Sequence, residues 1–364
     1  MIKKKIVFVI GKLSAGGAER VISTLSNNLV GKYHVTIITS FESSPFYALD
    51  KNVKIVSCFE QENSNSTGFL SSIKLNFQLA KKITDLSKQE GADVLIGFIT
   101  QINVLTVISS RINRIPCIIS ERTNPVLDET INGFWKTFRR IFYPFADCLI
   151  VQTSAVQNFY KKYLGVDKIK LLPNPISIGL AERKQSIPKK NIVLNVGRLH
   201  KVKNQKLLVE VFSEINPETW ELHIVGEGPE RGNLESLIVK NQMKGKIILH
   251  GNQTDIAKFY NQSKVFVFTS NYEGFPNALI EAQYFGLACI SVDCPSGPSD
   301  IITDGHDGFL IPQHQAQRLK KMLEKLISDE MLQKKFGENS IENSKKYASD
   351  YLMTKWDEVI EKLI

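Results

Sequence analysis

The stretch VFVFTSNYEGFPNALIEAQYFG, residues 265–286, decides the fold of this chain. It opens with an apolar run, passes through a turn containing Asn, Gly and Pro, and continues with a mostly apolar, helix-like segment. A buried strand followed by a helix is the repeating unit of a parallel sheet covered on both faces. Glu281 lies in the apolar part of the predicted helix, and another carboxylate, Glu273, precedes it by eight positions.

Strand-like runs of this kind recur along the chain and alternate with amphipathic segments. The candidates are residues 5–10, 34–39, 53–57, 93–98, 117–120 and 148–152 in the first half and 191–196, 221–225, 246–250, 265–269 and 288–292 in the second. Such alternation, occurring twice, predicts two doubly wound α/β domains.

The break between the domains is predicted near the extended segment PNPI, residues 173–176, because each X-Pro step disfavours helix. We therefore expect an N-terminal domain at residues 1–176 and a C-terminal domain at 177–342. A final helix, 343–364, is expected to pack back towards the N-terminal domain.

Charge is distributed unevenly. Residues 1–176 hold 22 basic and 13 acidic residues, a net +9, whereas residues 177–364 hold 24 of each. An anionic membrane, a polyphosphate or a nucleic acid would suit the basic half. The five cysteines form no C-x-x-C pair, which argues against a zinc site or a disulfide framework and suits a reducing cytoplasm. The start, MIKKKIVFVIG, is predicted to be a strand, because its apolar run is too short for a signal peptide.

A glycine pair, Gly16 and Gly17, separates the first predicted strand from a helix. Glycine lets a backbone approach a ligand closely, and free amides at a helix start favour an anion. The spacing is not G-x-G-x-x-G, so the dinucleotide fingerprint is absent, and a plain glycine turn is the alternative.

A basic pair, Arg198 and Lys203, follows the strand 191–196. Ligands of open α/β sheets bind at the carboxyl ends of strands, and a short loop lets both cations converge on one diphosphate. Two solvated surface charges are the alternative.

The acidic pair belongs to the same predicted edge. Glu273 follows the carboxyl end of a strand, and Pro276 suits the first turn of the next helix, whose start would present the amides around Phe275, Asn277 and Ala278. No Lys, Arg or His occurs in residues 271–286, so Glu281 is predicted to accept hydrogen bonds from ligand hydroxyls, such as those of a ribose. A helix register in which Glu281 faces water is the alternative.

Taken together, G-R-L…K-N at 197–204, V-G-x-G-P at 225–229 and E-G-F-P-N-A-L-x-E at 273–281 resemble the retaining glycosyltransferases of family 4. The resemblance covers nearly the whole chain. It implies the α/β GT-B fold, two facing Rossmann-like domains with the active site in the cleft between them. It also implies a nucleotide-sugar donor bound by the C-terminal domain, and neither a metal nor another cofactor.

By that resemblance, Arg198 and Lys203 would hold the diphosphate, Glu273 would face the donor sugar and Glu281 would bind the ribose. The other implied donor-binding residues are Gly16, Gly17, Gly197, Gly226, Gly274, Phe275, Pro276, Asn277, Ala278 and Leu279. Some members of the family place a His in the N-terminal domain, but the comparable loop here, SERTNP at 120–125, has none. Glu121 and Arg122 are therefore candidate contacts to acceptor or donor, with their roles open.

The segment INGFWKTFRRIFYPF, 131–145, has apolar residues at helical spacing, with Lys136, Arg139 and Arg140 on the other side. A basic amphipathic helix with Trp and Phe suits an anionic interface or a lipid diphosphate. A helix packed on its own domain with a solvated basic face is the alternative.

The sequence thus predicts a retaining transferase that moves a hexose or N-acetylhexosamine from a nucleotide sugar to a saccharide, in bacterial polysaccharide or glycan assembly. A UDP-sugar is favoured over GDP-mannose. The acceptor is expected to be lipid-linked and the enzyme peripheral on the cytoplasmic face of the cell membrane. A sugar-nucleotide epimerase and a non-catalytic sugar-nucleotide binding subunit stay open. A nucleic-acid partner is not expected, because no recognised binding motif occurs.

Overall fold

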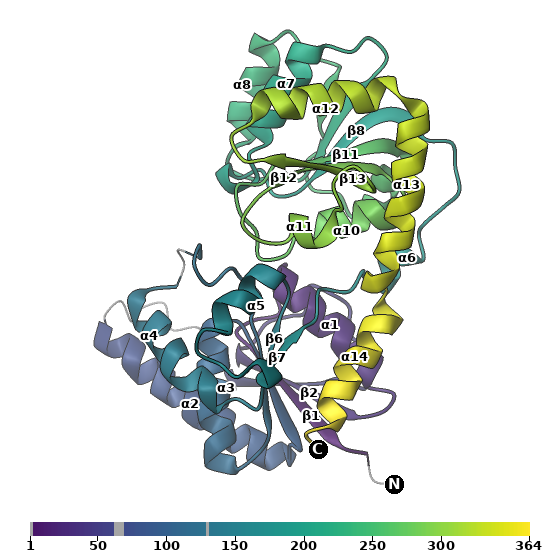
Figure 1. Cartoon of the computed structure of the whole chain (residues 1–364). Coiled ribbons are helices and arrows are strands. Elements are labelled where there is room, and N and C mark those ends of the chain that lie inside the picture. Colours follow the sequence, from purple (N-terminus) through teal and green to yellow (C-terminus); the bar gives the residue numbers. More distant parts are fainter. Residues whose placement is uncertain (1–2, 62–68, 129–130) are drawn as a thin grey trace. The chain divides into compact units, whose positions relative to one another are not determined.

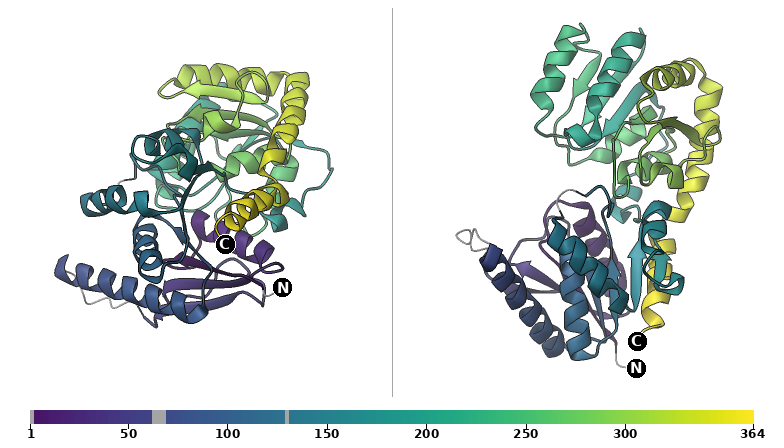
Figure 2. Two further views of the ribbon diagram at one scale, coloured as in Figure 1. Left: turned by 60° about the horizontal axis from the view of Figure 1, so that its bottom comes forward. Right: turned by 60° about the vertical axis from the view of Figure 1, so that its left-hand side comes forward.

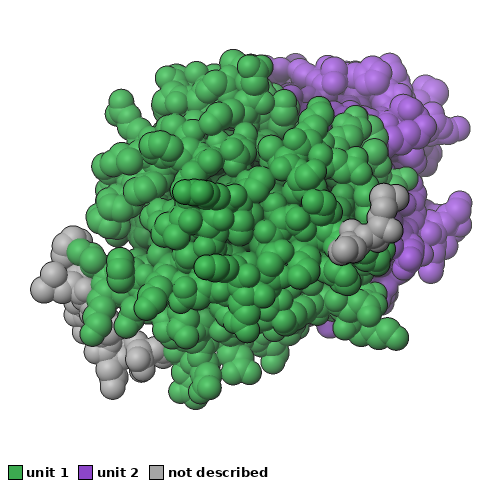
Figure 3. All heavy atoms as spheres, turned by 90° about the horizontal axis from the view of Figure 1, so that it is seen from below, with its two compact units in different colours: residues 1–175, 350–364 green, residues 176–349 purple. Residues whose placement is uncertain are grey.

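The computed structural model describes residues 3–61, 69–128 and 131–364 (Figure 1). The chain divides into two compact units, residues 1–175 with 350–364, and residues 176–349 (Figure 3). Each unit is a parallel sheet with helices on both faces, which is the predicted Rossmann-like α/β architecture. The final helix was predicted at residues 343–364. In the structure, α13 (Glu330–Ser344) runs past residue 343, and the last helix is α14 (Ser349–Glu361), which packs in the first unit.

Within the described residues, the first unit holds a seven-stranded sheet in the order β3-β2-β1-β4-β5-β6-β7, with every pairing parallel. Its strands are β1 (Lys5–Ile10), β2 (His34–Phe41), β3 (Lys54–Phe59), β4 (Val94–Phe98), β5 (Cys117–Ser120), β6 (Cys148–Val151) and β7 (Ile169–Leu171). Its α-helices are α1 (Gly17–Leu29), α2 (Phe69–Glu90), α3 (Thr100–Asn113), α4 (Gly133–Phe142), α5 (Ser154–Tyr160) and α14. The strand β7 was not among the sequence candidates.

The faces of this sheet follow from the alternation of side chains along a strand. Ile6 and Phe8 of β1 pack in a core shared with α1 and α14, whereas Val7 and Val9 pack with α2 and α3. Figure 2 shows α2 and α3 side by side on their face of the sheet. Both faces are covered, which explains why β1 is apolar at almost every position.

The second unit has six strands in its sheet, counted over the part of the chain described, in the all-parallel order β10-β9-β8-β11-β12-β13. They are β8 (Lys190–Val196), β9 (Glu221–Val225), β10 (Ile247–Leu249), β11 (Ser263–Phe268), β12 (Ala288–Asp293) and β13 (Gly308–Pro312). Its α-helices are α6 (Ile178–Ala181), α7 (Gln205–Ile215), α8 (Arg231–Lys240), α9 (Ile256–Gln262), α10 (Asn277–Tyr284), α11 (Pro298–Ile301), α12 (Ala316–Ser328) and α13. Helices α7, α8 and α12 lie on one face of the sheet, and α10 and α11 on the other (Figure 1).

Strand order reverses between β1 and β4 in the first unit and between β8 and β11 in the second. At such a switch point the connections on either side leave in opposite directions, which opens a crevice at the carboxyl ends of the strands. The loops that follow β8 and β11 are therefore the first place to look for a ligand site in the second unit.

Candidate active site

The loops after β8 and β11 are joined by hydrogen bonds at the switch point of the second unit. The backbone N–H of Asn271 donates to the carbonyl of Val202 at 2.8 Å, and the hydroxyl of Thr269 donates to the carbonyl of Lys203 at 3.0 Å. These bonds make the two loops one surface, so the basic and the acidic motif come together.

The side chains of Lys203 and Glu273 form an ion pair across this surface. Lys203 Nζ lies 2.5 Å from Glu273 Oε1, and the two side chains are 27% and 11% exposed. Lys203 Nζ also lies 5.6 Å from the centre of the Phe268 ring. The pair is partly shielded from water, so each charge holds the other in place more firmly than an exposed pair would.

Arg198 lies on the same loop with an exposed side chain. Its backbone carbonyl accepts a hydrogen bond from Gln205 Nε2 at 3.1 Å, which ties the loop to the start of α7. The loop is thus held by its backbone, while the guanidinium projects into solvent.

Glycines allow a second loop, after β9, to press against the Arg198 loop. A Cβ atom at Gly226, where φ is +142°, would lie 2.0 Å from the carbonyl oxygen of Gly197. A Cβ atom at Gly228 would lie 2.3 Å from the carbonyl oxygen of Leu199. Any larger residue would push the two loops apart, which gives the V-G-x-G-P motif its physical reason.

The start of α10 differs from the prediction. Pro276 precedes the helix, and the backbone N–H of Asn277 is already used, because it donates to the carbonyl of Phe275 at 3.0 Å. The side chains of Phe275 and Leu279 are 7% and 0% exposed and belong to the core, so only their backbones are available to a ligand. Ala278, in the first turn of the helix, is half-buried.

Glu281 is buried, with 4% of its surface exposed, so the alternative in which it faces water is wrong. It has a protein partner that the sequence did not indicate: the hydroxyl of Tyr260, on α9, donates to Glu281 Oε2 at 2.9 Å. Ligand hydroxyls, which were predicted to bond Glu281, would therefore share its carboxylate with Tyr260. Tyr260 lies 21 residues upstream, and no local spacing links it to the motif.

Two lysines fix the other end of α10. Lys184 Nζ donates to the carbonyl of Tyr284 at 2.5 Å, and Lys189 Nζ donates to the carbonyls of Phe285 and Gly286 at 2.8 and 3.0 Å. Cations at a helix C-terminus satisfy its last carbonyls and oppose the negative end of the dipole. Burial lowers the pKa of Lys189 to about 8.

The turn after β12 closes the same surface. Ser296 is buried and its hydroxyl donates to the carbonyl of Gly274 at 3.3 Å. At Gly297, where φ is +103°, a Cβ atom would lie 2.4 Å from Pro276 Cδ. The turn thus packs against the segment that leads into α10 and holds Gly274 in place.

The glycine pair of the first unit carries its own carboxylate. Gly16 precedes α1, which begins at Gly17, and a Cβ atom at Gly16 would lie 2.1 Å from Glu19 Oε2. Glu19 also accepts a hydrogen bond from the hydroxyl of Ser14 at 3.1 Å. An acidic side chain therefore lies where free amides for a ligand anion were expected.

Glu121, after β5, lies inside the first unit with 1% of its surface exposed. Its carboxylate accepts hydrogen bonds from the hydroxyls of Tyr160, Tyr143 and Thr100 at 2.8, 2.9 and 3.1 Å. Burial raises the pKa of Glu121, and the nearby charge of Arg139 opposes that rise. Since its oxygens are surrounded by protein hydroxyls, Glu121 holds this part of the first unit together from within and does not present its carboxylate to a ligand.

Arg122 is also buried, with 8% of its surface exposed. Its guanidinium lies 4.8 Å from the Phe98 ring and 5.7 Å from the Trp356 ring, and Nη1 donates to Asn174 Oδ1 at 2.7 Å. Burial lowers the pKa of Arg122 to about 9. The residue links the ends of β4 and β5 to α14.

The helix predicted at 131–145 is shorter, α4 followed by the turn Tyr143–Phe145, and its basic side is not uniformly solvated. Lys136 and Arg140 are exposed, but Arg139 is 5% exposed, donates to the carbonyl of Pro125 at 3.2 Å and lies over the rings of Phe159 and Tyr160. Arg139 is therefore excluded from any contact with a membrane surface.

Over the described ranges, no cluster of three or more His, Cys, Asp or Glu side chains has the spacing to hold a metal ion. None of the described helices combines the length and the apolar character needed to cross a membrane.

Comparisons with known proteins agree with this fold. Residues 15–179 match the model of Glycosyltransferase Family 4, and residues 180–343 match that of Glycosyl transferases group 1. A Campylobacter jejuni α-1,4-N-acetyl-D-galactosaminyltransferase, named for an undecaprenol diphosphate-linked saccharide, is 31% identical over 98% of both chains. The amylovoran biosynthesis glycosyltransferase AmsD of Erwinia amylovora is 27% identical over 98% of this chain and 99% of AmsD. The structure of Anabaena HepE in complex with UDP superposes with a TM-score of 0.82 at 16% identity, covering 99% of this chain and all of that one.

Proposed function

The chain belongs to the GT-B glycosyltransferases, and from that premise we propose that it is a retaining enzyme that transfers a sugar from a UDP-sugar to a lipid-linked saccharide. Its similarity to relatives that are named glycosyltransferases shows that it is a hexosyltransferase. Beyond the family and the enzyme class, we propose the sugar donor, the stereochemistry of the transfer, the acceptor and the residues that carry out the reaction.

The observation that carries the proposal is the Lys203–Glu273 pair on the joined loops of the second unit. The pair lies at a switch point, where α/β sheets bind their ligands. We assign Lys203 and Arg198 to the diphosphate of the donor, because an ammonium and a guanidinium match its charge and its oxygens. Glu273, held by Lys203, then faces the transferred sugar and can accept hydrogen bonds from its hydroxyls.

Glu281 is assigned to the ribose. Tyr260 occupies one side of its carboxylate and fixes its orientation, and a carboxylate has acceptor sites on two oxygens. A UDP donor is supported by the solved neighbour HepE, which holds UDP. An N-acetylhexosamine as the transferred sugar is supported by the Campylobacter relative, which is named an N-acetylgalactosaminyltransferase.

As the bond between the sugar and the diphosphate breaks, negative charge builds up on the leaving group. Arg198 and Lys203 stabilise that charge and so lower the barrier. In the donor unit Glu273 is held by Lys203 and Glu281 by Tyr260, so neither of these two carboxylates is presented as a free nucleophile. We therefore propose a front-face displacement with retention, in which the leaving phosphate helps to deprotonate the acceptor hydroxyl.

A lipid-linked acceptor is supported by two observations. The Campylobacter relative is named for a saccharide on undecaprenol diphosphate, and the net +9 of this chain falls in residues 1–176. A basic surface attracts both an anionic membrane and a lipid diphosphate. The protein is thus proposed to work at the cytoplasmic face of the membrane, as a peripheral protein.

Thermal unfolding with a panel of nucleotide sugars tests the donor. A ligand at about 100 times its Kd that binds only the folded chain adds about 2.7 kcal/mol of stability. We expect UDP-N-acetylgalactosamine, UDP-N-acetylglucosamine or UDP-glucose to stabilise the protein and GDP-mannose to do so less. A larger shift with GDP-mannose would overturn the UDP assignment, and release of free sugar or interconversion without an acceptor would point to a hydrolase or an epimerase.

Transfer is expected to proceed without a metal ion, because side-chain cations are proposed to stabilise the leaving group. EDTA should leave at least half of the transfer rate, measured with a radiolabelled UDP-sugar. Complete loss that Mg²⁺ or Mn²⁺ restores would contradict the assignment of Arg198 and Lys203.

A further inference from the structure

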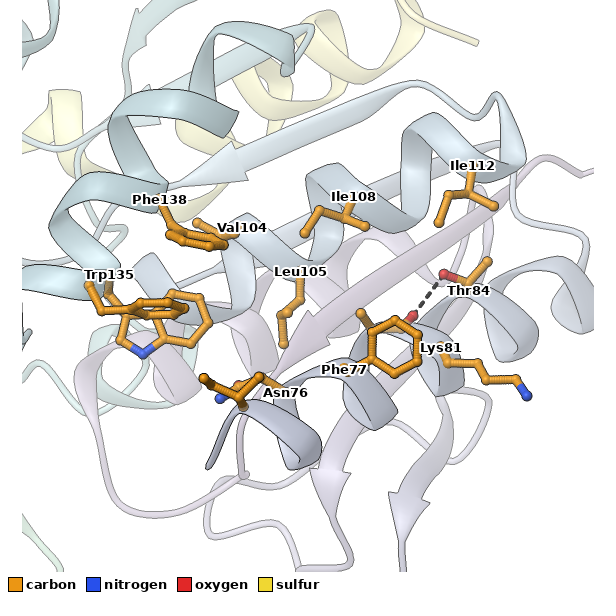
Figure 4. A pocket seen from close by; sticks show the side chains of 13 residues that line it. Asn76, Phe77, Lys81, Thr84, Val104, Leu105, Ile108, Ile112, Trp135 and Phe138 are labelled. Carbon is orange, nitrogen blue, oxygen red and sulfur yellow. Dashed lines mark hydrogen bonds between the residues drawn. The ribbon is translucent and has the colours of Figure 1, made fainter. Parts of the chain in front are cut away.

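A groove of about 630 Å³ lies between α2, α3 and α4 of the first unit (Figure 4). Its walls are apolar stripes at helical spacing, with Ile73 and Phe77 from α2, Ile108 and Ile112 from α3, and Trp135 and Phe138 from α4. The volume lies in the usual range of ligand sites, about 300–1,000 Å³.

The uncharged polar side chains in the groove wall, Thr84 and Asn76, are already bonded inside the protein. Thr84 donates to the carbonyl of Ala80 at 2.7 Å, a bond drawn in Figure 4, and lies 3.0 Å from the hydroxyl of Ser109. Asn76 accepts a hydrogen bond from Gln101 at 2.7 Å. A polar ligand would lose its hydrogen bonds to water and regain few, so the groove selects hydrocarbon.

The groove is open at the surface. Phe77 is 72% exposed, Ile112 is 65% exposed and Ile73 is 41% exposed, all on the same side of the unit. Large apolar side chains that gather on one surface mark a binding site more often than single exposed ones do.

Charge around the groove indicates the kind of occupant. Lys81 lines it and extends away from the apolar floor in Figure 4, and Lys74, Lys136 and Arg140 are exposed on the helices that form its walls. No carboxylate is among the described residues that line it. A second copy of this chain would bring the same positive charge to the contact, whereas an anionic lipid would meet charge of opposite sign.

We propose that this groove takes up a hydrocarbon chain of an anionic membrane lipid, with Lys81 at the head group. The proposal goes beyond the transfer reaction, because it would hold for any acceptor. It moves the membrane contact from the basic side of α4, as predicted from sequence, to the groove that α4 forms with α2 and α3.

Trp135 in the groove wall provides a direct measurement. Vesicles of phosphatidylglycerol with brominated chains should quench its fluorescence at low salt, and vesicles of brominated phosphatidylcholine should quench it at least tenfold less. The Trp135→Phe variant should lose the quenching, since Trp220 and Trp356 are buried in the two cores. Equal quenching by both lipids, or quenching that persists in Trp135→Phe, would overturn the proposal.

Uncharged substitutions in the groove test its role without adding charge. Phe77→Ser and Ile112→Ser remove exposed apolar groups and should each weaken binding to phosphatidylglycerol vesicles by at least fivefold, and Lys81→Gln by at least threefold. Phe46→Ser is the matched control, because Phe46 is 67% exposed in the same unit and does not line the groove. Equal vesicle affinity in all four variants would contradict the proposal. A dimer in solution that the groove substitutions dissociate and Phe46→Ser does not would also contradict it, because the groove would then bind a second copy of the chain. Since no donor residue is changed, UDP-sugar binding reports separately on the proposed function.

Discussion

Replacing Lys203 by Ala is expected to lower kcat/KM for the donor by roughly 10- to 150-fold. Lys203 is proposed to contact the diphosphate directly, and a hydrogen bond to a charged group contributes about 1.5–3 kcal/mol. The substitution also leaves Glu273 without the cation that holds it at 2.5 Å. The loss should therefore appear in kcat as well as in KM, because the leaving group gains charge only as the bond breaks. Steady-state kinetics with a UDP-sugar measures both.

Lys201→Ala is the matched control for this substitution. Lys201 belongs to the same short turn, Lys201–Lys203, but its side chain is exposed and takes part in no ion pair within the described residues. It should stay within twofold of the unmodified enzyme. Arg198→Ala, in contrast, should fall in the same range as Lys203→Ala. Unchanged kcat/KM in both Arg198→Ala and Lys203→Ala would remove the diphosphate site from this loop.

A double-mutant cycle with Glu273→Gln separates the two roles of Lys203. If Lys203 acts only by holding Glu273, the double variant should be no slower than Glu273→Gln alone. If Lys203 also binds the diphosphate, the double variant should be slower than Glu273→Gln alone. The second outcome is expected, because an ammonium at 27% exposure still has donors to offer beyond one carboxylate.

Much of the fold follows from local sequence, for a physical reason. A strand buried on both faces must be apolar throughout, so runs such as Cys117–Ser120 are visible without a structure. The strand β7 (Ile169–Leu171) was missed and is recognised by its pairing with β6, whereas the equally short β10 lies inside the predicted run 246–250. The units and their parallel sheets were thus predictable, but the outer strand β7 was not.

The contacts within the candidate sites were even less predictable from local sequence than the short strand. Adjacent strand ends bring Lys203 to Glu273, but the adjacency of β8 and β11 is a property of the sheet, not of either motif. Tyr260 reaches Glu281 from a helix of its own. Arg139 has basic neighbours in the sequence, yet it is buried, because it packs over two rings of α5 and donates a hydrogen bond to the carbonyl of Pro125. In each case the partner comes from another element, so residue spacing within one segment carries no trace of it.

The largest stability effect is expected from Trp356→Ala in α14. Trp356 is fully buried in the core of the first unit, and its ring stacks on Phe98 with centres 6.2 Å apart and planes 10° apart. Truncating a buried Trp costs about 3–5 kcal/mol, since the lost contacts leave a cavity. At about 2–4 °C per kcal/mol for a unit of this size, the Tm of the first unit should fall by roughly 6–20 °C.

Tyr351→Ala provides the comparison on the same helix. Tyr351 is 50% exposed, so its loss should cost less than about 0.5 kcal/mol. Calorimetry can follow the unit with residues 1–175 and 350–364 separately from the unit with residues 176–349, because a UDP-sugar is expected to stabilise only the latter. Trp356→Ala should lower the transition that UDP-sugar does not shift. A Tm for Trp356→Ala within 2 °C of that for Tyr351→Ala would mean that α14 is not part of this core.

Trp356→Ala should also affect Arg122, whose guanidinium lies 5.7 Å from the Trp356 ring, because Arg122 would lose one of its two aromatic neighbours. The end of the chain therefore supports the loop after β5 through that ring, and removing the ring should disturb this loop before it disturbs the donor loops.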